Sequence, residues 1–166
     1  MNRKRSVNPK RVSTEQRVVP QFVPQLIYSR DESVGPQKGT AKSARILVIE
    51  DDFLVAWQIK EALEAGGFEV AGTAVNAEEA MQIAVTQSPA LAITDIHLAG
   101  KRDGIDAAIK LFREHSIRCI FATAHYDTLA RERAQAANPL GWLQKPYTMQ
   151  SLLYTVRQAI RALESH

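Results

Sequence analysis

Short apolar runs and helix-like segments alternate along the chain from residue 44 onward. Apolar runs predict buried strands at residues 44–50, 68–75, 90–94, 119–123 and 141–144. After each run, apolar residues recur at three- and four-residue spacing, which predicts helices at residues 52–65, 76–87, 104–115, 127–137 and 149–163. Two glycines, Gly66 and Gly67, end the first predicted helix, and Asn76 is a suitable cap for the second.

This regular alternation of strand and helix predicts an α/β fold, in which helices cover both faces of a parallel sheet. Residues 1–43 show neither period and are rich in Pro, Gln, Ser and Arg. We therefore expect a basic, flexible, mostly disordered tail over residues 1–43 and one folded domain over residues 44–166.

The net charge of +3 is unevenly distributed along the chain. Residues 1–43 hold nine Lys and Arg against three acids, whereas residues 44–166 hold twelve against fifteen. The basic tail leaves open a weak contact with nucleic acid or with an acidic partner. Its segment VVPQFVPQLIY, at residues 18–28, could instead dock as an extended peptide on a protein.

Apolar content of 45% and charged content of 23% are ordinary for a globular protein. No apolar run is long enough to span a membrane, and the first residues lack the apolar core of a secretion signal. The one cysteine, Cys119, lies in an apolar run, so we expect it to be buried and reduced. A cytoplasmic protein is the expected class.

Polar side chains follow four of the predicted strands at the point where each strand ends. They are Glu50 and Asp51 after the first strand, Asp95 after the third, Thr123 after the fourth and Lys145 after the fifth. In open α/β sheets the site lies outside the carboxyl ends of the strands. We therefore expect these side chains to lie together at one edge of the sheet.

Three carboxylates at one edge repel one another unless a cation offsets their charge. Carboxylate oxygens suit Mg²⁺, which is usually held by one or two carboxylates together with waters and a phosphate. A lysine ammonium and a threonine hydroxyl beside a carboxylate are suited to phosphoryl transfer, because that chemistry depends on positioning and charge neutralisation. An aspartate nucleophile would then form an acyl phosphate.

Residues 44–164 resemble the receiver domain of response regulators in two-component signalling. The motifs that carry the resemblance are ILVIED, the apolar run into Thr94 and Asp95, the threonine of FAT, and LQKP. The resemblance implies a flavodoxin-like (βα)5 doubly wound parallel sheet with the strand order 2-1-3-4-5.

The resemblance also implies a phosphorylation site with Mg²⁺ as its cofactor. Asp95 would be the phosphoacceptor, and Asp51 the principal metal ligand. Glu50 would act through water or the metal shell, and the backbone carbonyl of His97 would complete the protein ligands.

The remaining family positions concern the phosphate and the activated state. Lys145 would bind the phosphate, and its bond to Pro146 is often cis in this family. Thr123 would be the switch hydroxyl. The switch aromatic, usually Tyr or Phe, is Trp142 here. A core aromatic on a short strand is the alternative interpretation of Trp142.

The sequence departs from the common receiver pattern in two loops. The proline expected four residues after the acceptor is Ala99, and one extra residue precedes Gly104. The segment IFATAHYD is similar to the FATGUY subgroup of single-domain receivers, which also lacks that proline. Where the subgroup has glycine and an aromatic residue, this chain has Ala124 and His125.

Two histidines occupy positions that flank the phosphoryl group in receivers, namely His97 and His125. One interpretation is that both are exposed polar residues without a role. The alternative hypothesis is that their protonation changes the lifetime of the acyl phosphate between about pH 5 and 8. Capture of a transition metal by histidine and carboxylate is a minor alternative.

We therefore expect a single-domain response regulator without a DNA-binding or enzymatic domain after the receiver. A sensor histidine kinase or a histidine phosphotransfer protein would phosphorylate Asp95, and the output would be a protein–protein contact. Enzymatic activity would be limited to phosphoryl transfer to itself and autodephosphorylation. The resemblance also allows a homodimer through the helices predicted at residues 127–137 and 149–163.

Three rival functions remain for the same sequence. A haloacid-dehalogenase-like phosphohydrolase needs a second aspartate two residues after the nucleophile, and that position is His97. A nucleotide-binding module needs a glycine-rich loop after the first strand, which this chain lacks. A receiver that regulates a nucleic-acid contact of the basic tail is the third rival.

Overall fold

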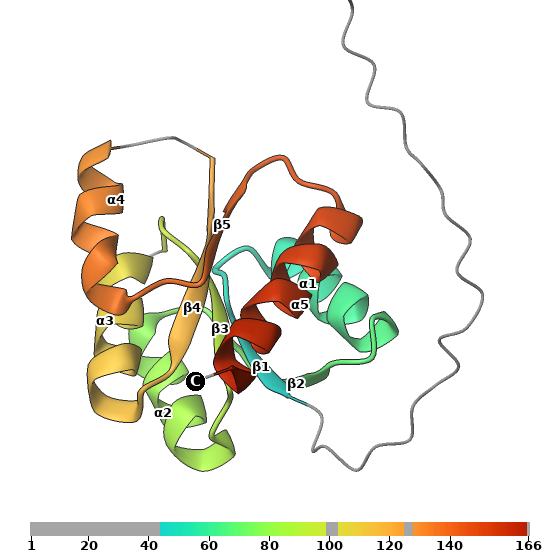
Figure 1. Cartoon of the computed structure of the whole chain (residues 1–166), viewed down its shortest axis with the longest axis horizontal. Coiled ribbons are helices and arrows are strands. Elements are labelled where there is room, and N and C mark those ends of the chain that lie inside the picture. The colour runs from blue at the N-terminus through green and yellow to red at the C-terminus, as the bar shows by residue number, and fades with distance from the viewer. Residues whose placement is uncertain (1–43, 99–102, 125–127, 166) are drawn as a thin grey trace, which may run out of the picture. The chain divides into compact units, whose positions relative to one another are not determined.

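The computed structural model describes residues 44–98, 103–124 and 128–165. Five parallel strands form one sheet in the order β2-β1-β3-β4-β5 (Figure 1). They are β1 (Arg45–Ile49), β2 (Glu69–Ala74), β3 (Leu91–Asp95), β4 (Arg118–Thr123) and β5 (Gly141–Gln144). The predicted α/β class and strand order are confirmed. The predicted tail at residues 1–43 lies outside the described residues.

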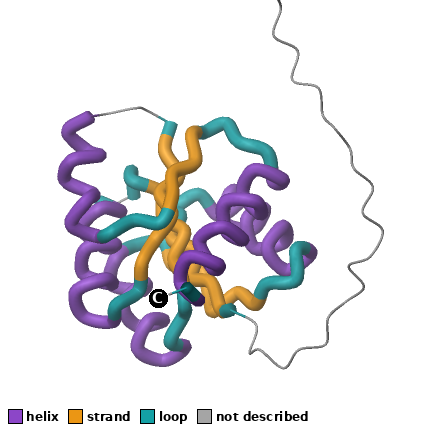
Figure 2. The backbone as a smooth tube through the Cα atoms, in the orientation of Figure 1, coloured by secondary structure: helices purple, strands orange, loops and turns teal. Residues whose placement is uncertain are grey.

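Helices cover both faces of this sheet (Figure 2). Their bounds are α1 (Phe53–Ala65), α2 (Ala77–Gln87), α3 (Gly104–His115), α4 (Thr128–Ala134) and α5 (Met149–Glu164). In Figure 1, α1 and α5 lie on one face of the sheet, and α2, α3 and α4 lie on the other. None of these described helices has both the length and the apolar content that crossing a membrane requires.

The central strand β1 shows why both faces must be covered. Residues 46–49 are fully buried. Since successive side chains of a strand point to opposite faces, Leu47 and Ile49 pack in the core under α2 and α3, while Ile46 and Val48 pack in the core under α1 and α5. The continuous apolar run that predicted a doubly buried strand is thereby explained.

Side-chain caps fix where the helices begin. Asp52 accepts hydrogen bonds from the backbone N–H groups of Leu54 and Val55, so it caps α1 from one residue outside the helix. Asn76 caps α2 as predicted, with its side chain accepting from the N–H of Glu79. Each cap satisfies an amide that the first helical turn leaves without a partner.

The inward faces of the first and last helices are also those predicted. In α1, Ile59 and Leu63 are buried and Val55 packs beside them. In α5, the buried residues Leu152 and Val156 lie in the same core, with Ile160 and Leu163 partly buried at its margin. Both helices therefore present their apolar stripes to one face of the sheet.

The helix predicted at residues 127–137 is wrong in its last turn. The α-helix ends at Ala134, and a 3-10 turn follows at Gln135–Ala137. Asn138 then takes a left-handed conformation with φ 47°. Pro139 follows, and a residue before proline is disfavoured in the α conformation, so the helix tightens and stops. Asp127, the predicted first residue, lies outside the described residues.

Cys119 is buried in β4 and unpaired, as predicted. Burial raises the pKa of its thiol to about 12, against a small lowering by the charge of Arg118. A thiol in this state is a poor nucleophile at neutral pH. Cys119 is therefore a core residue rather than a reactive one.

Gly104, the first residue of α3, is pressed against the end of β3. A Cβ atom at this position would lie 1.7 Å from the carbonyl oxygen of Asp95. Gly104→Ala should therefore lower the free energy of unfolding by about 3 kcal/mol or more, because backbone cannot yield as a side chain can. Urea denaturation measures the change.

Gly72→Ala is the matched control for this prediction. A Cβ at Gly72 would meet the flexible side chain of Ile83, with its nearest atom at 3.0 Å. We expect a cost of about 1 kcal/mol or less there. Equal costs at the two glycines would show that contact with the Asp95 carbonyl is not what selects glycine at residue 104.

Candidate functional site

The ends of four strands meet at one edge of the sheet, as predicted. Asp95 ends β3 and Thr123 ends β4, while Glu50 and Lys145 directly follow β1 and β5. Because β1, β3, β4 and β5 are consecutive neighbours in the sheet, their carboxyl ends lie side by side. The backbone N–H of Lys145 donates to the carbonyl oxygen of Thr123 at 2.7 Å, which fixes where the lysine leaves the sheet.

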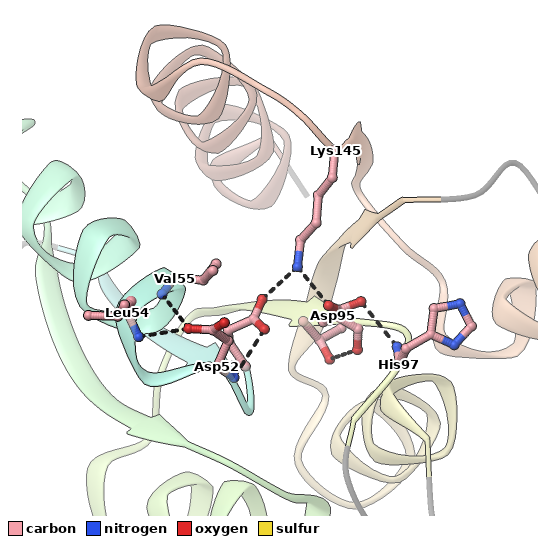
Figure 3. Close-up of polar contacts among 8 residues, drawn as sticks. Asp52, Leu54, Val55, Asp95, His97 and Lys145 are labelled. Atoms are coloured by element: carbon pink, nitrogen blue, oxygen red, sulfur yellow. Dashed lines mark hydrogen bonds and ion pairs between the residues drawn. The ribbon is translucent and has the colours of Figure 1, made fainter.

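Lys145 joins the two acids nearest to it (Figure 3). Its Nζ lies 2.7 Å from Oε2 of Glu50 and 2.6 Å from Oδ2 of Asp95. The side chains of Glu50 and Asp95 are 4% and 12% exposed, and that of Lys145 is 22% exposed. These are charge-assisted hydrogen bonds in a largely dry place, unlike ordinary surface ion pairs.

The pKa shifts at this cluster reflect a balance between burial and charge. Burial acts to lower the pKa of Lys145, but hydrogen bonds to Asp95 and Glu50, together with their charges, raise the pKa above its usual value. For Glu50, burial raises the pKa more than Lys145 lowers it. The lysine therefore stays charged, while the ionised form of Glu50 carries a net cost.

The three acids that follow β1 do not point the same way. Glu50 is buried and turns to Lys145, whereas Asp51 and Asp52 are exposed. Asp52 caps α1, and its own N–H lies 3.4 Å from Oε1 of Glu50. Their divergence, together with the ammonium of Lys145 beside Glu50, reduces the repulsion expected for consecutive carboxylates.

Asp95 is held at both oxygens of its carboxylate. Oδ2 accepts from Lys145, and Oδ1 accepts from the backbone N–H of His97 at 3.1 Å. The side chain of His97 is exposed, and its proposed effect on phosphoryl lifetime stays a prediction. His125, the second histidine of that hypothesis, lies outside the described residues, as does Ala99.

Thr123 is 7% exposed at the end of β4, next to Gln144 in the register of β4 and β5. The peptide bond between Lys145 and Pro146 is cis, as the family resemblance implies. The structure thus places a buried hydroxyl-bearing residue beside the strand that supplies the lysine. Its role as a switch stays a prediction.

Trp142 packs against the core as a half-buried aromatic. Its ring centroid lies 4.9 Å from that of Phe121, at an interplanar angle of 31°. On the indole, the guanidinium carbon of Arg131 lies 4.5 Å from the ring centroid. These two contacts fit the interpretation of Trp142 as a core aromatic, and whether the ring moves on activation stays a prediction.

Sequence reasoning missed three residues around the site. Arg131 and Phe121 both contact Trp142, and Tyr147 lies partly buried two residues after Lys145. Burial raises the pKa of the Tyr147 hydroxyl, with opposing smaller effects from Lys145 and the acids. The position of Tyr147 directly after Lys145 and Pro146 was a usable signal, whereas nothing in the sequence paired Arg131 with Trp142.

The donors expected for Mg²⁺ are present but not arranged as a finished metal site. Among residues 44–98, 103–124 and 128–165, no group of three His, Cys, Asp or Glu side chains could hold a metal ion as it stands. The carboxylates of Glu50 and Asp95 instead contact the same ammonium nitrogen. Hard oxygen donors beside one positive charge are the type of ligand that a small divalent cation prefers.

The raised pKa of Glu50 makes a prediction about stability. Its pKa in the folded protein lies above the ordinary value of 4.5, so the contribution of Glu50 to the unfolding free energy falls as pH rises through 4.5 and toward the folded pKa. Glu50→Gln replaces the titrating carboxyl with an amide that does not titrate. The variant should therefore gain stability relative to the wild type between about pH 3.5 and pH 7, as measured by urea denaturation at both pH values.

Glu69→Gln, which removes an exposed carboxyl on β2, is the control for this measurement. Its stability relative to the wild type should change little over the same pH range, because an exposed carboxyl keeps its hydration in the folded state. If Glu50→Gln instead lost stability relative to the wild type as pH rose, the pairing with Lys145 would outweigh burial.

Comparison with known proteins agrees with this geometry. Residues 46–157 match the response regulator receiver domain family. The chain is 31% identical over 116 residues to the transcriptional regulatory protein PdtaR of Mycobacterium tuberculosis, covering 70% of this chain and 56% of that protein. It is 30% identical over 131 residues to the phyllosphere-induced regulator PhyR of Methylorubrum extorquens, covering 78% and 48%.

Solved structures of receiver domains share the fold. The receiver domain of a modulated diguanylate cyclase from Desulfovibrio desulfuricans has a TM-score of 0.69 at 33% identity, covering 74% of this chain and 97% of that one. The receiver domain of PhyR from Erythrobacter litoralis has a TM-score of 0.63 at 28% identity, covering 74% and 94%. The chain spans about half the length of the curated relatives it matches. It belongs to the response regulator receiver domain family.

Proposed function

We propose that Asp95 accepts a phosphoryl group from a phosphorylated histidine of a partner protein, with Mg²⁺ as cofactor. The observation that carries this proposal is the bond from the Lys145 ammonium to Oδ2 of Asp95, made at the buried rim of the sheet. A lysine that already contacts the nucleophilic carboxylate is placed to contact an oxygen of the arriving phosphoryl group.

The transfer breaks a P–N bond and forms a P–O bond. An ionised oxygen of Asp95 attacks phosphorus, and the histidine nitrogen leaves with the bonding electrons and is protonated as imidazole. Lys145 shifts from the carboxylate to a phosphoryl oxygen, where its charge is neutralised again. Thr123 at the end of β4 offers a hydroxyl to another phosphoryl oxygen.

The protein groups that would hold Mg²⁺ are Asp51, Asp95 and the backbone carbonyl of His97, with Glu50 acting through water or the metal shell. Mg²⁺ would supply neutralisation of the charge on the carboxylate and on the phosphoryl oxygens. Lys145 supplies part of that charge in the structure described here. Glu50 must therefore exchange one cationic partner for another when the site is loaded.

The partner would approach beside α1, where large apolar side chains are exposed next to the site. Phe53, Leu54 and Trp57 are 76%, 65% and 52% exposed. Trp57 also lines a groove of about 660 Å³ between α1 and α5, together with Met149 and Leu153. Exposed apolar patches of this kind mark interaction sites, and helix α1 begins directly after the acidic residues.

The output would be a protein–protein contact that depends on phosphorylation. Phosphorylation would bias a two-state element around Thr123, Trp142 and the face formed by α4 and α5. A second copy of the chain could bind at that face. A cytoplasmic location and a sensor histidine kinase or phosphotransfer protein as donor belong to the same proposal.

The acceptor is tested by incubation with acetyl phosphate and Mg²⁺. Intact mass spectrometry should detect one added phosphate on the wild type and none on Asp95→Asn, because the amide is not a nucleophile for this transfer. Lys145→Ala should react about 100-fold more slowly, as expected for loss of a charged group that stabilises the transition state. Chelation of Mg²⁺ with EDTA should abolish the reaction of the wild type.

Glu114→Gln is a matched control, because it removes an exposed carboxyl from the last turn of α3 and leaves both the rim and the start of α3 untouched. It should accept phosphate at the wild-type rate. Phosphate on Asp95→Asn at the wild-type level would refute Asp95 as the acceptor.

The partner surface is tested by comparing two phosphodonors. With a phosphorylated phosphotransfer protein that modifies the wild type, Trp57→Ala should react about tenfold more slowly, since a buried aromatic anchor contributes at least about 1–2 kcal/mol to an interface. With acetyl phosphate, the same variant should react at the wild-type rate. Val85→Ala, which shortens an exposed side chain on α2, is the control for the opposite face of the sheet.

A further inference from the structure

Helix α4 has little apolar anchorage to the rest of the domain. Of its seven residues, Ala134 is the buried one, and Ala130 is a partly buried neighbour of the core. Leu129, its largest apolar residue, is 75% exposed. Burial of two alanine side chains contributes far less than burial of leucine or phenylalanine. Other contacts must therefore hold α4 in place.

Two arginines of α4 supply such contacts. Arg131 covers the ring of Trp142 in β5, with 4.5 Å between the guanidinium carbon and the ring centroid. Arg133 forms an ion pair with Oδ2 of Asp103 and lies 3.5 Å from Oδ1 of Asp106. Helix α4 is thus fastened by cationic side chains to a neighbouring strand and to the start of α3.

Asp103 both caps α3 and binds an arginine of α4. Its Oδ1 caps α3 by accepting from the N–H of Asp106 at 3.0 Å, while its Oδ2 takes the guanidinium of Arg133. Both oxygens of the cap are therefore engaged, each by a different helix. The position of the first turn of α3 and the position of α4 depend on the same side chain.

The start of α3 is in turn tied to the proposed phosphoacceptor. The N–H of Gly104 donates to the carbonyl oxygen of Ile96 at 2.8 Å. The Cα of Gly104 lies so close to the Asp95 carbonyl that no side chain would fit between them. A shift of the backbone at Asp95 and Ile96 must therefore move Gly104, and with it Asp103.

We propose that the contacts of Arg133 with Asp103 and Asp106, here named the α3–α4 clamp, couple phosphorylation of Asp95 to helix α4. This inference rests on the proposed function. A phosphoryl group on Asp95 replaces contacts that its carboxylate now makes with His97 and Lys145. The backbone at Asp95 and Ile96 then adjusts, α3 moves at its first turn through Gly104, and the clamp carries the displacement to α4. This route does not pass through Thr123 or Trp142.

The ion pairs of the clamp are weak enough to form and break while the domain stays folded. Exposed ion pairs such as these contribute little to global stability and are weakened by salt. For a short helix with small apolar anchors, the same contacts decide how often it opens locally. The clamp can thus alter the behaviour of α4 without altering whether the domain folds.

Hydrogen exchange on the full chain tests the clamp, read from peptides that cover residues 128–134. The variants are Arg133→Gln, Asp103→Asn and the double variant, before and after phosphorylation with acetyl phosphate and Mg²⁺. Asn caps helices about as well as Asp, so Asp103→Asn removes the charge and leaves the α3 cap in place. Arg157→Gln, at an exposed position on α5, is the control for loss of one positive charge.

Without phosphate and at low salt, exchange in α4 should be about two- to fivefold faster in both single variants than in the wild type. The double variant should exchange no faster than the singles, and the difference from the wild type should shrink in 1 M salt, on the order of the screening expected there. Phosphorylation should change α4 exchange in the wild type and in Arg157→Gln. Most of that change should be lost in Arg133→Gln and Asp103→Asn.

The clamp proposal is wrong if phosphorylated Arg133→Gln shows the full wild-type change in α4. It is equally wrong if the wild type takes up phosphate and α4 does not respond, or if unphosphorylated variants exchange like the wild type. Intact mass separates these results from failure of the proposed function. If the wild type takes up no phosphate, Asp95 is not the acceptor and the coupling proposal falls with it.

Discussion

The ammonium of Lys145, shared between Glu50 and Asp95, is the interaction on which the rest of the site depends. It allows two poorly hydrated carboxylates to stand at the ends of neighbouring strands. Without a cation there, burial and mutual repulsion would favour protonation of one of them. If Asp95 is the acceptor, as proposed, the same lysine also holds a positive charge where the phosphoryl group would arrive.

Much of this arrangement follows from the sequence for a simple reason. Apolar runs doubly buried between helix layers leave few alternatives to a parallel sheet, and a parallel sheet brings its carboxyl ends to one edge. Polar residues at those strand ends therefore lie close together regardless of the conformation of the loops. Glu50, Asp95 and Lys145 could be placed together for that reason, and the caps at Asn76 and the inward faces of α1 and α5 follow from equally local rules.

Contacts between side chains of distant elements were not predictable in the same way. Arg131 on Trp142 and Arg133 on Asp103 depend on the angle at which α4 lies, and no periodic pattern encodes that angle. The early end of α4 has a local cause in Asn138 and Pro139, which the helical spacing of alanines concealed. Alanine has the highest helix propensity, so the alanines at 136 and 137 gave no sign that the α-helix would end before them.

The contacts that the sequence predicts lie at the rim of the sheet, whereas the contacts that it does not predict hold helix α4. The rim is fixed mainly by β1, β3 and β4, most of whose side chains are buried, and such a frame deforms little when a ligand arrives. Helix α4 is attached through exposed guanidinium groups to a helix cap and to an aromatic face, and such contacts exchange at small cost. A domain that must hold its chemistry rigid and still report it needs both kinds of attachment. Here they meet where the Asp95 carbonyl at the end of β3 leaves no room for a side chain at Gly104, the first residue of α3.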